Sequence, residues 1–332
     1  MNNFWKNKRV FITGANGFLG AHLTKSLVEK GVRPFVLIFE ENPGGIFDEE
    51  RLADKTRVIR GDILDLKLIR KILKENKIDT IFHLAAQAAV DQAVDNPLQT
   101  FETNIGGTWN ILEASRNSKT IKRIIVASSD KAYGHHDVLP YEEHTHPLKG
   151  IYPYEVSKTC ADLITQSYWK TFNLPVCITR CTNLYGPGDL KFSRIVPNTI
   201  NLLHKRQSPI IRDNGSTLRD YLYVEDAAEA YIRLAEKMNK KIFGHAFNFS
   251  TNIPISAQKA IGVISSAMRR DIAPKIIRTK GFEIKNQYAS YVKAKTLLQW
   301  KPQHNFIEGV KKTIPWYLQY LENNPPLINY FD

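Results

Sequence analysis

Cysteine is scarce in this sequence and long apolar runs are missing, and both absences exclude classes of protein. The 332 residues include three cysteines, Cys160, Cys177 and Cys181, with no close Cys-x-x-Cys pair and no histidine cluster beside them. We therefore expect buried thiols, and neither a disulfide framework nor a metal site. The longest apolar runs have the length of a strand, and the first residues lack the apolar stretch of a signal peptide. We expect a cytoplasmic protein that does not enter a membrane.

A concentrated patch of charge is also missing, although the formal net charge is +13. Lysine and arginine are spread from Lys6 to Lys312, and the densest run, LKLIRKILKENK at 66–77, has the spacing of an amphipathic helix whose charges face solvent. Proteins that bind nucleic acid usually concentrate basic residues on one face. We therefore expect no nucleic-acid partner, and the basic balance also fits an anionic small molecule.

The sequence does contain a regular alternation of strand-like and helix-like segments. RVFITG at 9–14 and RPFVLIFE at 33–40 are typical of buried strands, and GFLGAHLTKSLVEKG at 17–31 is typical of a helix. Strands that are joined by helices pair in parallel. Because the alternation continues to LPVCITRC at 174–181, the sequence predicts an α/β fold with a doubly wound parallel sheet of the Rossmann type.

The alternation breaks after Asn183, where glycine, proline and charged residues become frequent. We predict that residues 183–221 and 251–332 form a smaller, mostly helical substrate domain. Residues 1–182, together with about 222–250, are predicted to form the dinucleotide-binding domain. The predicted substrate domain is therefore discontinuous in sequence.

The segment GANGFLG at 14–20 directly follows the first predicted strand. Its three glycines allow a tight turn and let a phosphate approach the backbone, and the helix that follows presents free N–H groups to an anion. The position immediately after a buried strand favours a dinucleotide site over an ordinary tight turn. The residues predicted to contact the cofactor here are Gly14, Asn16, Gly17, Phe18, Leu19 and Gly20.

Acidic residues after the second and third predicted strands indicate which dinucleotide binds. Glu40 or Glu41 follows the second strand, where a carboxylate can accept hydrogen bonds from a ribose diol and would repel a 2′-phosphate. Asp62 follows the third strand with Ile63 beside it, and this pair can contact adenine. Small residues end the fourth strand and leave room for the cofactor. The sequence therefore predicts NAD, with Glu40, Asp62, Ile63, Leu84, Ala85 and Ala86 among its contacts.

These motifs occur together with YPYEVSK at 152–158 and RCTNLYGPGD at 180–189. The combination, which extends to TLLQWKP at 296–302, resembles the extended short-chain dehydrogenase/reductase family. The resemblance implies that Tyr154 takes the proton of a sugar hydroxyl. Lys158 would share its site, because residues four apart lie on one helix face. Both residues would also contact NAD.

The segment SSDKAYG at 128–134 distinguishes two activities within that family. Sugar 4-epimerases usually have small, unreactive residues after the serine, whereas nucleotide-sugar 4,6-dehydratases have a reactive pair. Those that act on CDP-glucose have a pattern like Ser129-Asp130-Lys131. The resemblance implies that Asp130 is the acid at the departing 6-hydroxyl, that Lys131 removes or relays the C5 proton, and that Ser129 contacts the substrate oxygen beside the tyrosine.

Strand geometry sets a condition on that assignment. Neighbouring residues in a regular strand point to opposite faces, so the strand must end before Asp130 if both side chains are to serve one site. If the strand continues, Lys131 is instead a structural ion-pair partner.

The resemblance also concerns the substrate and the assembly. Asn183 is implied to contact a diphosphate, and Arg194 and Arg219 can each hold one by two-pronged hydrogen bonds. A homodimer is implied through the helices that follow Pro97 and Tyr154. We predict NAD-dependent dehydration of a nucleoside-diphosphate hexose, similar to CDP-glucose 4,6-dehydratases and belonging to polysaccharide synthesis. A 4-epimerase and a non-catalytic dinucleotide-binding protein are the alternatives, and the base and the sugar stay open.

Overall fold

A computed structural model describes residues 4–212, 215–277 and 284–324 of the protein. At its centre lies a sheet of seven strands, all paired in parallel within these residues. The strands are β1 (Val10–Thr13), β2 (Phe35–Ile38), β3 (Arg57–Arg60), β4 (Thr80–His83), β5 (Arg123–Ala127), β6 (Val176–Cys181) and β11 (Ala246–Phe249). Their order is β11-β6-β5-β4-β1-β2-β3, which confirms the predicted doubly wound sheet.

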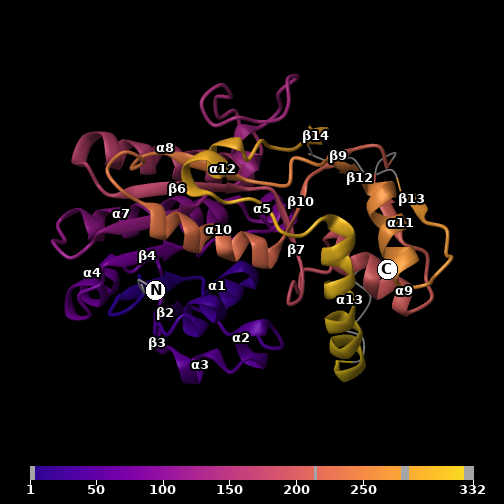
Figure 1. Ribbon diagram of the computed structural model, residues 1–332, viewed down its shortest axis with the longest axis horizontal. Helices are drawn as coiled ribbons and strands as arrows, with labels where there is room; N and C mark the ends of the chain where they lie inside the picture. The colour runs from indigo at the N-terminus through magenta and orange to yellow at the C-terminus, as the bar shows by residue number, and fades with distance from the viewer. Residues whose placement is uncertain (1–3, 213–214, 278–283, 325–332) are drawn as a thin grey trace.

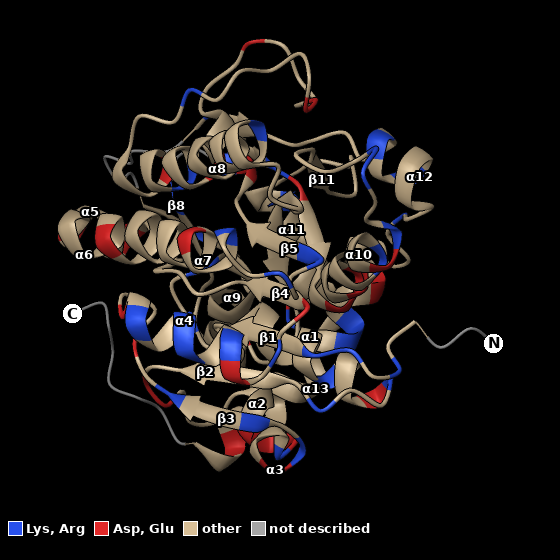
Figure 2. Cartoon of the chain, turned by 90° about the vertical axis from the view of Figure 1, so that its left-hand side faces the viewer, with Lys and Arg blue, Asp and Glu red and all other residues tan. Residues whose placement is uncertain are grey.

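Helices cover both faces of this sheet, as Figure 2 shows. One layer consists of α1 (Phe18–Glu29), α10 (Val224–Lys237) and α12 (Val292–Leu298), and the other of α4 (Leu66–Glu75), α7 (Gly107–Arg116) and α8 (Pro153–Phe172). Because successive strand residues point to opposite faces, Ile12 and Phe82 pack into the core of the first layer and Phe11 and Ile81 into that of the second. The sheet is therefore buried on both sides.

Helix α4 is the basic helix predicted from the densest run of charge. Its residues Ile69, Ile72 and Leu73 are buried against the sheet, while its lysines and arginines face outward (Figure 2). Asp65 caps the helix, because its side chain accepts a hydrogen bond of 2.9 Å from Leu68 N. The charge of this helix is thus a solvated face.

A second lobe lies beside the carboxyl ends of the strands (Figure 1, right). Its helices are α9 (Ile195–His204), α11 (Ala257–Ala267) and α13 (Phe306–Asn323). Short strands pair around them: β7 (Asn183–Tyr185) with β10 (Tyr221–Tyr223), β8 (Ile210–Arg212) with β13 (Lys275–Ile277), and β9 (Leu218–Arg219) with both β12 (Ile255–Ser256) and β14 (Asn286–Gln287). Tyr185, Ile200, Ile264 and Ile314 lie in its apolar core.

The remaining helical segments are short. They are α2 (Ile46–Glu49), α3 (Leu52–Lys55), α5 (Val90–Asp95), α6 (Pro97–Phe101), the π-helical turn η1 (Glu102–Gly106) and the 3₁₀ turn η2 (Asp130–Tyr133). The sequence predicts one long helix from Asn96 to Ser118, and η1 interrupts it between α6 and α7.

The division into two domains stays a prediction, and the packing adds one detail to it. Ala294, Leu298 and Trp300 lie in the core of the first helical layer, although they fall within the range 251–332 assigned to the substrate domain. Chain from the second half therefore returns to the sheet. Within residues 4–212, 215–277 and 284–324, no helix is long and apolar enough to cross a membrane.

Candidate active site

A single cavity of about 1430 Å³ lies where the strand order reverses, between β1 and β4, and extends toward the second lobe. Open parallel sheets bind ligands at such a point, because the loops that follow the two strands diverge there. The cavity brings together all the site residues predicted from the sequence: Gly14, Asn16, Gly17, Phe18, Leu19, Gly20, Glu40, Asp62, Ile63, Leu84, Ala85, Ala86, Ser129, Asp130, Lys131, Tyr154, Lys158, Asn183, Arg194 and Arg219. Their individual roles stay predictions.

The glycine loop forms one end of this cavity. Gly14 has a φ of +69°, and a Cβ there would lie 2.7 Å from Ala85 N. A Cβ on Gly20 would lie 1.9 Å from Gly14 O, so only glycine fits at the start of α1. Gly17 is the N-cap residue and has no side chain that could accept a hydrogen bond from the first N–H groups of the helix. The loop has the geometry that receives a pyrophosphate.

The loops after β2 and β3 form the next part of the wall. Glu40 lines the cavity, whereas Glu41 makes an ion pair with Arg60. Asn16 donates a hydrogen bond of 2.7 Å to Glu40 O, which ties the glycine loop to this acidic residue. Of the two glutamates predicted for the ribose, Glu40 is therefore the one placed at the cavity.

The turn after β5 satisfies the condition set by strand geometry. The strand ends at Ala127, and Asp130 begins the 3₁₀ turn η2. Ser129 caps this turn by accepting a hydrogen bond of 3.2 Å from Lys131 N. Because the backbone turns here, Ser129, Asp130 and Lys131 can all line one cavity. The expected bend is present, and the objection to a shared site does not apply.

Asp130 is a buried acid whose environment favours its neutral form. The residue is only 2% exposed. Burial raises the pKa of its carboxyl to about 6, although the charge of Lys131 acts to lower that pKa. Oδ1 accepts a hydrogen bond of 3.2 Å from Ser129 Oγ. Oδ2 has no hydrogen-bond partner among the described residues. Such an acid can hold a proton close to neutral pH and give it to a bound molecule.

Tyr154 and Lys158 lie on the first turns of α8, which begins at Pro153. Burial raises the pKa of the Tyr154 phenol to about 12, and Arg194 is the largest charge acting in the opposite direction. Burial also lowers the pKa of Lys158 to about 8, and its Nζ donates a hydrogen bond of 2.9 Å to Ala127 O. Burial therefore outweighs the charges that lower the pKa of the Tyr154 phenol.

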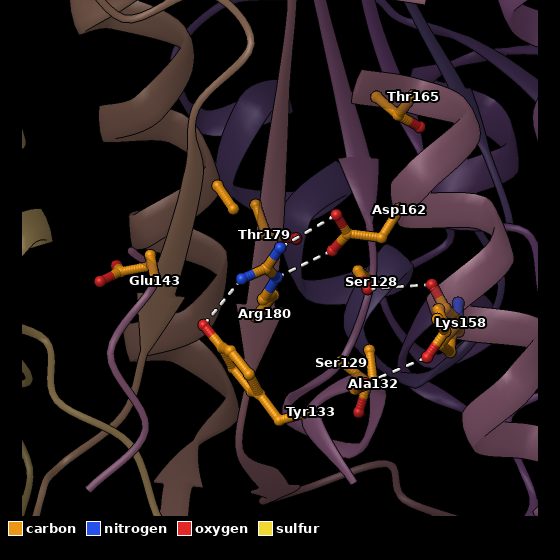
Figure 3. A network of polar contacts seen from close by, with 12 residues as sticks. Ser128, Ser129, Ala132, Tyr133, Glu143, Lys158, Asp162, Thr165, Thr179 and Arg180 are labelled. Carbon is orange, nitrogen blue, oxygen red and sulfur yellow. Dashed lines mark hydrogen bonds and ion pairs between the residues drawn. The ribbon is translucent and has the colours of Figure 1, made fainter. Parts of the chain in front are cut away.

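Arg180 joins α8, which carries Tyr154 and Lys158, to η2, which begins at Asp130 (Figure 3). Its Nε and Nη2 donate to both carboxylate oxygens of Asp162 on α8, at 2.8 and 3.0 Å. Its Nη1 donates to Tyr133 OH in η2, at 2.8 Å. Thr159 Oγ1 adds a hydrogen bond of 3.0 Å to Ala132 O. The arginine therefore clamps α8 to the turn that contains Asp130 and Lys131, a function that the sequence analysis did not assign to it.

The second lobe supplies the other wall of the cavity. Arg194 Nη1 donates to both carboxylate oxygens of buried Asp189 at 3.1 Å, so it is an ion-paired residue and not a freely solvated one. Asn183 Nδ2 donates to Asp220 O at 3.3 Å. The sequence offered a signal for Asp189, because it ends the motif RCTNLYGPGD, but no partner could be assigned to it.

Arg219 donates hydrogen bonds to three backbone carbonyl groups. Its Nη1 donates to Leu218 O and Lys285 O, at 2.9 and 3.1 Å, and its Nη2 donates to Ile284 O at 2.6 Å. These bonds fix the segment before β14 against β9. The two-pronged contact with a diphosphate stays a prediction for this residue.

All three cysteines are free thiols. Cys177 and Cys181 are buried free thiols as predicted, and Cys160 is a free thiol that is partly exposed. Among the described residues, no group of three or more histidine, cysteine, aspartate or glutamate side chains is arranged to hold a metal ion.

The fold and the cavity define an α/β protein that is built to bind a dinucleotide beside a second ligand. A family model described as GDP-mannose 4,6 dehydratase matches residues 11–313. The chain belongs to this family, within the extended short-chain dehydrogenases/reductases.

Individual relatives agree with the family assignment. The dTDP-D-glucose 4,6-dehydratase of Homo sapiens is 28% identical over 326 residues, which cover 95% of this chain and 91% of that protein. The CDP-glucose 4,6-dehydratase of Salmonella typhimurium is 29% identical over 345 residues, which cover 98% of this chain and 95% of that protein. Both relatives are similar along nearly their whole length.

Solved structures share the architecture. UDP-glucose 4-epimerase from Thermotoga maritima, determined with UDP-glucose, superposes with a TM-score of 0.87 at 25% identity over 94% of this chain and 99% of that chain. dTDP-glucose 4,6-dehydratase from Bacillus anthracis, determined in complex with NAD, superposes with a TM-score of 0.84 at 23% identity over 95% of this chain and 98% of that chain. Solved structures named for both activities therefore share this fold.

Proposed function

We propose that this protein is an NAD-dependent nucleotide-sugar 4,6-dehydratase, which converts a nucleoside-diphosphate hexose into the 4-keto-6-deoxy sugar and water. The observation that carries the proposal is the turn after β5. It places a buried carboxyl with a raised pKa and a lysine in the same cavity as Tyr154 and Lys158. The names of the relatives support this activity. CDP-glucose is the first substrate to test, because Ser129-Asp130-Lys131 resembles the pattern of the enzymes that act on it.

The glycine loop and the wall beside it fit the cofactor. The cradle formed by Gly14 and Gly20 excludes any Cβ, so the backbone and the start of α1 can meet a pyrophosphate. Glu40 would hold the ribose diol, and Asp62 with Ile63 would contact the adenine. When bound, NAD supplies the hydride chemistry by accepting hydride from C4 of the sugar and returning it to C6.

In this proposal Tyr154 takes the proton of the 4-hydroxyl. Its pKa of about 12 keeps the phenol protonated before ligands bind. A nearby positive charge therefore has to stabilise the phenolate, and the charge of Arg194 already acts to lower the pKa of Tyr154. Nicotinamide would add charge of the same sign. In this proposal Tyr154 becomes a base only when the site is loaded.

The pair Asp130 and Lys131 would carry out the elimination. After C4 becomes a ketone, the C5 proton is acidic, so Lys131 can remove it while Asp130 protonates the departing 6-hydroxyl. The pair gains one proton and loses one, so its total proton count is unchanged. Lys131 then returns its proton to C5 as C6 receives hydride, and the proton that Tyr154 took from the 4-hydroxyl replaces the one that Asp130 gave to water. A 4-epimerase needs neither step.

The product identifies the activity. Purified protein with NAD is expected to convert at least one of the CDP-, GDP-, UDP- and dTDP-glucose substrates into a product lighter by one water, measured by mass spectrometry. A 4-epimerase would leave the mass of the substrate unchanged, so an isomer of equal mass would contradict the proposal. No turnover of any nucleotide sugar by correctly folded, NAD-binding protein would favour the non-catalytic alternative.

We also propose that the protein is a homodimer, formed through α6, α7 and α8. Large apolar side chains on these helices are exposed: Leu98, Trp109, Leu163 and Phe172 are 66%, 49%, 51% and 47% exposed. Exposed apolar side chains gathered on neighbouring helices indicate a surface that another chain covers. The helices are those predicted from the sequence.

Light scattering tests the dimer. The wild-type protein is expected to have twice the chain mass of 38.0 kDa, and the double variant Trp109→Glu/Leu163→Glu is expected to be monomeric, because it places charges in the proposed interface. Ile253→Glu is the matched control, since Ile253 is 63% exposed outside these helices. A wild-type monomer, or a dimer that survives the double variant, contradicts this interface.

A cytoplasmic location and a place in polysaccharide synthesis also belong to the proposal. The three free thiols fit a reducing compartment, where cysteines do not pair.

A further inference from the structure

The Lys131 ammonium contacts a side chain that the sequence analysis did not single out. Lys131 Nζ donates a hydrogen bond of 3.1 Å to Gln287 Oε1, across 156 positions of the chain. Gln287 lies on β14 in the second lobe and is completely buried. Because an ammonium group can only donate, the amide oxygen must face Lys131, and this fixes the orientation of the glutamine side chain.

The backbone holds Gln287 firmly at this place. β14 pairs in parallel with β9, and Gln287 O accepts a hydrogen bond of 3.3 Å from Asp220 N. On the following residues, Tyr288 O accepts from Tyr141 N at 3.0 Å and Ser290 N donates to Tyr141 O at 2.9 Å. The strand therefore cannot shift relative to β9 or Tyr141 without breaking several bonds.

The amide nitrogen of Gln287 indicates why this position holds an amide side chain. Gln287 Nε2 is buried and has no hydrogen-bond partner among the described residues. A buried polar group without a partner destabilises the folded state, so leucine would be the better residue if packing were the only requirement. The contact between the amide oxygen and Lys131 accounts for the presence of glutamine at this position.

We propose that Gln287 is a positioning residue for the elimination: it holds Lys131 Nζ beside the bound sugar without placing a charge next to it. The inference rests on the proposed function, in which Lys131 takes the C5 proton. A neutral amide orients the amine, whereas a carboxylate would favour the charged form of Lys131 and oppose its action as a base. The second lobe thus contributes to the chemistry as well as to substrate binding.

The elimination that Gln287 supports conserves atoms and electrons. The C5–H bond breaks and its proton joins Lys131, the electron pair forms the C5–C6 double bond, and the C6–O bond breaks. The leaving hydroxyl takes a proton from Asp130 and departs as water. Gln287 forms and breaks no covalent bond, so its effect is confined to the position and charge state of Lys131.

The experiment compares Gln287→Leu and Gln287→Glu with the wild-type enzyme in the presence of NAD and the substrate identified by product mass. Gln287→Leu is expected to slow both water loss and exchange of the C5 proton with deuterated solvent, on the order of 10²-fold, because a displaced catalytic group loses about that much. KM, the melting temperature and the first oxidation at C4, observed by nicotinamide absorbance, are expected to stay near wild type. For Gln287→Glu, the rise of kcat with pH is expected to move to higher pH.

A matched control is available on the surface. Gln299→Asn breaks a contact of the same kind, Lys237 Nζ to Gln299 Oε1 at 3.2 Å, and is expected to change none of these quantities. Wild-type exchange and an unchanged pH profile in both Gln287 variants would overturn the inference. So would equal losses of stability and of C4 oxidation, which indicate a purely structural residue. Failure of the proposed function looks different, because then the wild-type enzyme itself releases no water.

Discussion

Asp130→Asn is expected to nearly abolish water loss while the protein still binds NAD and still oxidises C4. Asparagine has nearly the same shape and remains able to accept the hydrogen bond from Ser129, but it cannot give a proton to the departing 6-hydroxyl. General acid catalysis contributes on the order of 10²- to 10⁴-fold, so the rate of water loss should fall by that factor. Mass spectrometry of the product measures the loss, and nicotinamide absorbance in a single turnover measures the oxidation.

The pH profile gives this prediction a second readout. Asp130 has a pKa of about 6, so below that pH both members of the pair carry a proton. No base is then left for C5, and the rate of water loss is expected to decrease as the pH falls through about 6. In Asp130→Asn, the residual rate should lack this inflection. Turnover equal to wild type in the variant would mean that Asp130 is not the acid.

Asp162→Ala is expected to produce the largest loss of stability among single substitutions near the site. Arg180 and Asp162 are 3% and 0% exposed, so removal of the carboxylate leaves a guanidinium buried beside a neutral cavity. Loss of one partner from a buried ion pair costs about 3–5 kcal/mol. Urea denaturation followed by fluorescence and by circular dichroism should show a lower midpoint. Because the clamp also connects α8 to η2, kcat should fall as well.

The double variant Arg180→Met/Asp162→Leu is the control for that prediction. It removes both charges and fills their space with apolar atoms, so the midpoint should recover most of the loss. If the double variant is no more stable than Asp162→Ala, desolvation of an unpaired charge is not the cause. A single variant with wild-type stability would show that the clamp contributes little to folding.

Local patterns predicted the parts of this molecule that depend on neighbouring residues. The parallel sheet follows from strands separated by helices, and the glycine loop follows from three glycines next to a buried strand. The pairing of Tyr154 and Lys158 follows from helical spacing alone. Each of these signals lies within about thirty residues, which is the length of one βαβ unit.

Local sequence patterns did not predict contacts between distant segments of the chain. Gln287 meets Lys131 only because β14 pairs with β9, and nothing in the residues around position 287 indicates that pairing. Arg219 has the sequence context of a diphosphate ligand, yet it donates hydrogen bonds to the carbonyl groups of Ile284 and Lys285. The burial that raises the pKa of Tyr154 likewise depends on the complete fold and not on the helix that bears the residue.

The bond between β14 and the turn after β5 limits how freely the protein can be recombined. A chimera that takes its second lobe from a relative is normally designed to change which nucleotide is recognised. Here the exchange would also replace Gln287, the neighbour of Lys131. A changed preference for the nucleotide base and a slower elimination would therefore occur together. Engineers who graft this lobe should therefore transplant the strand and the turn as one unit.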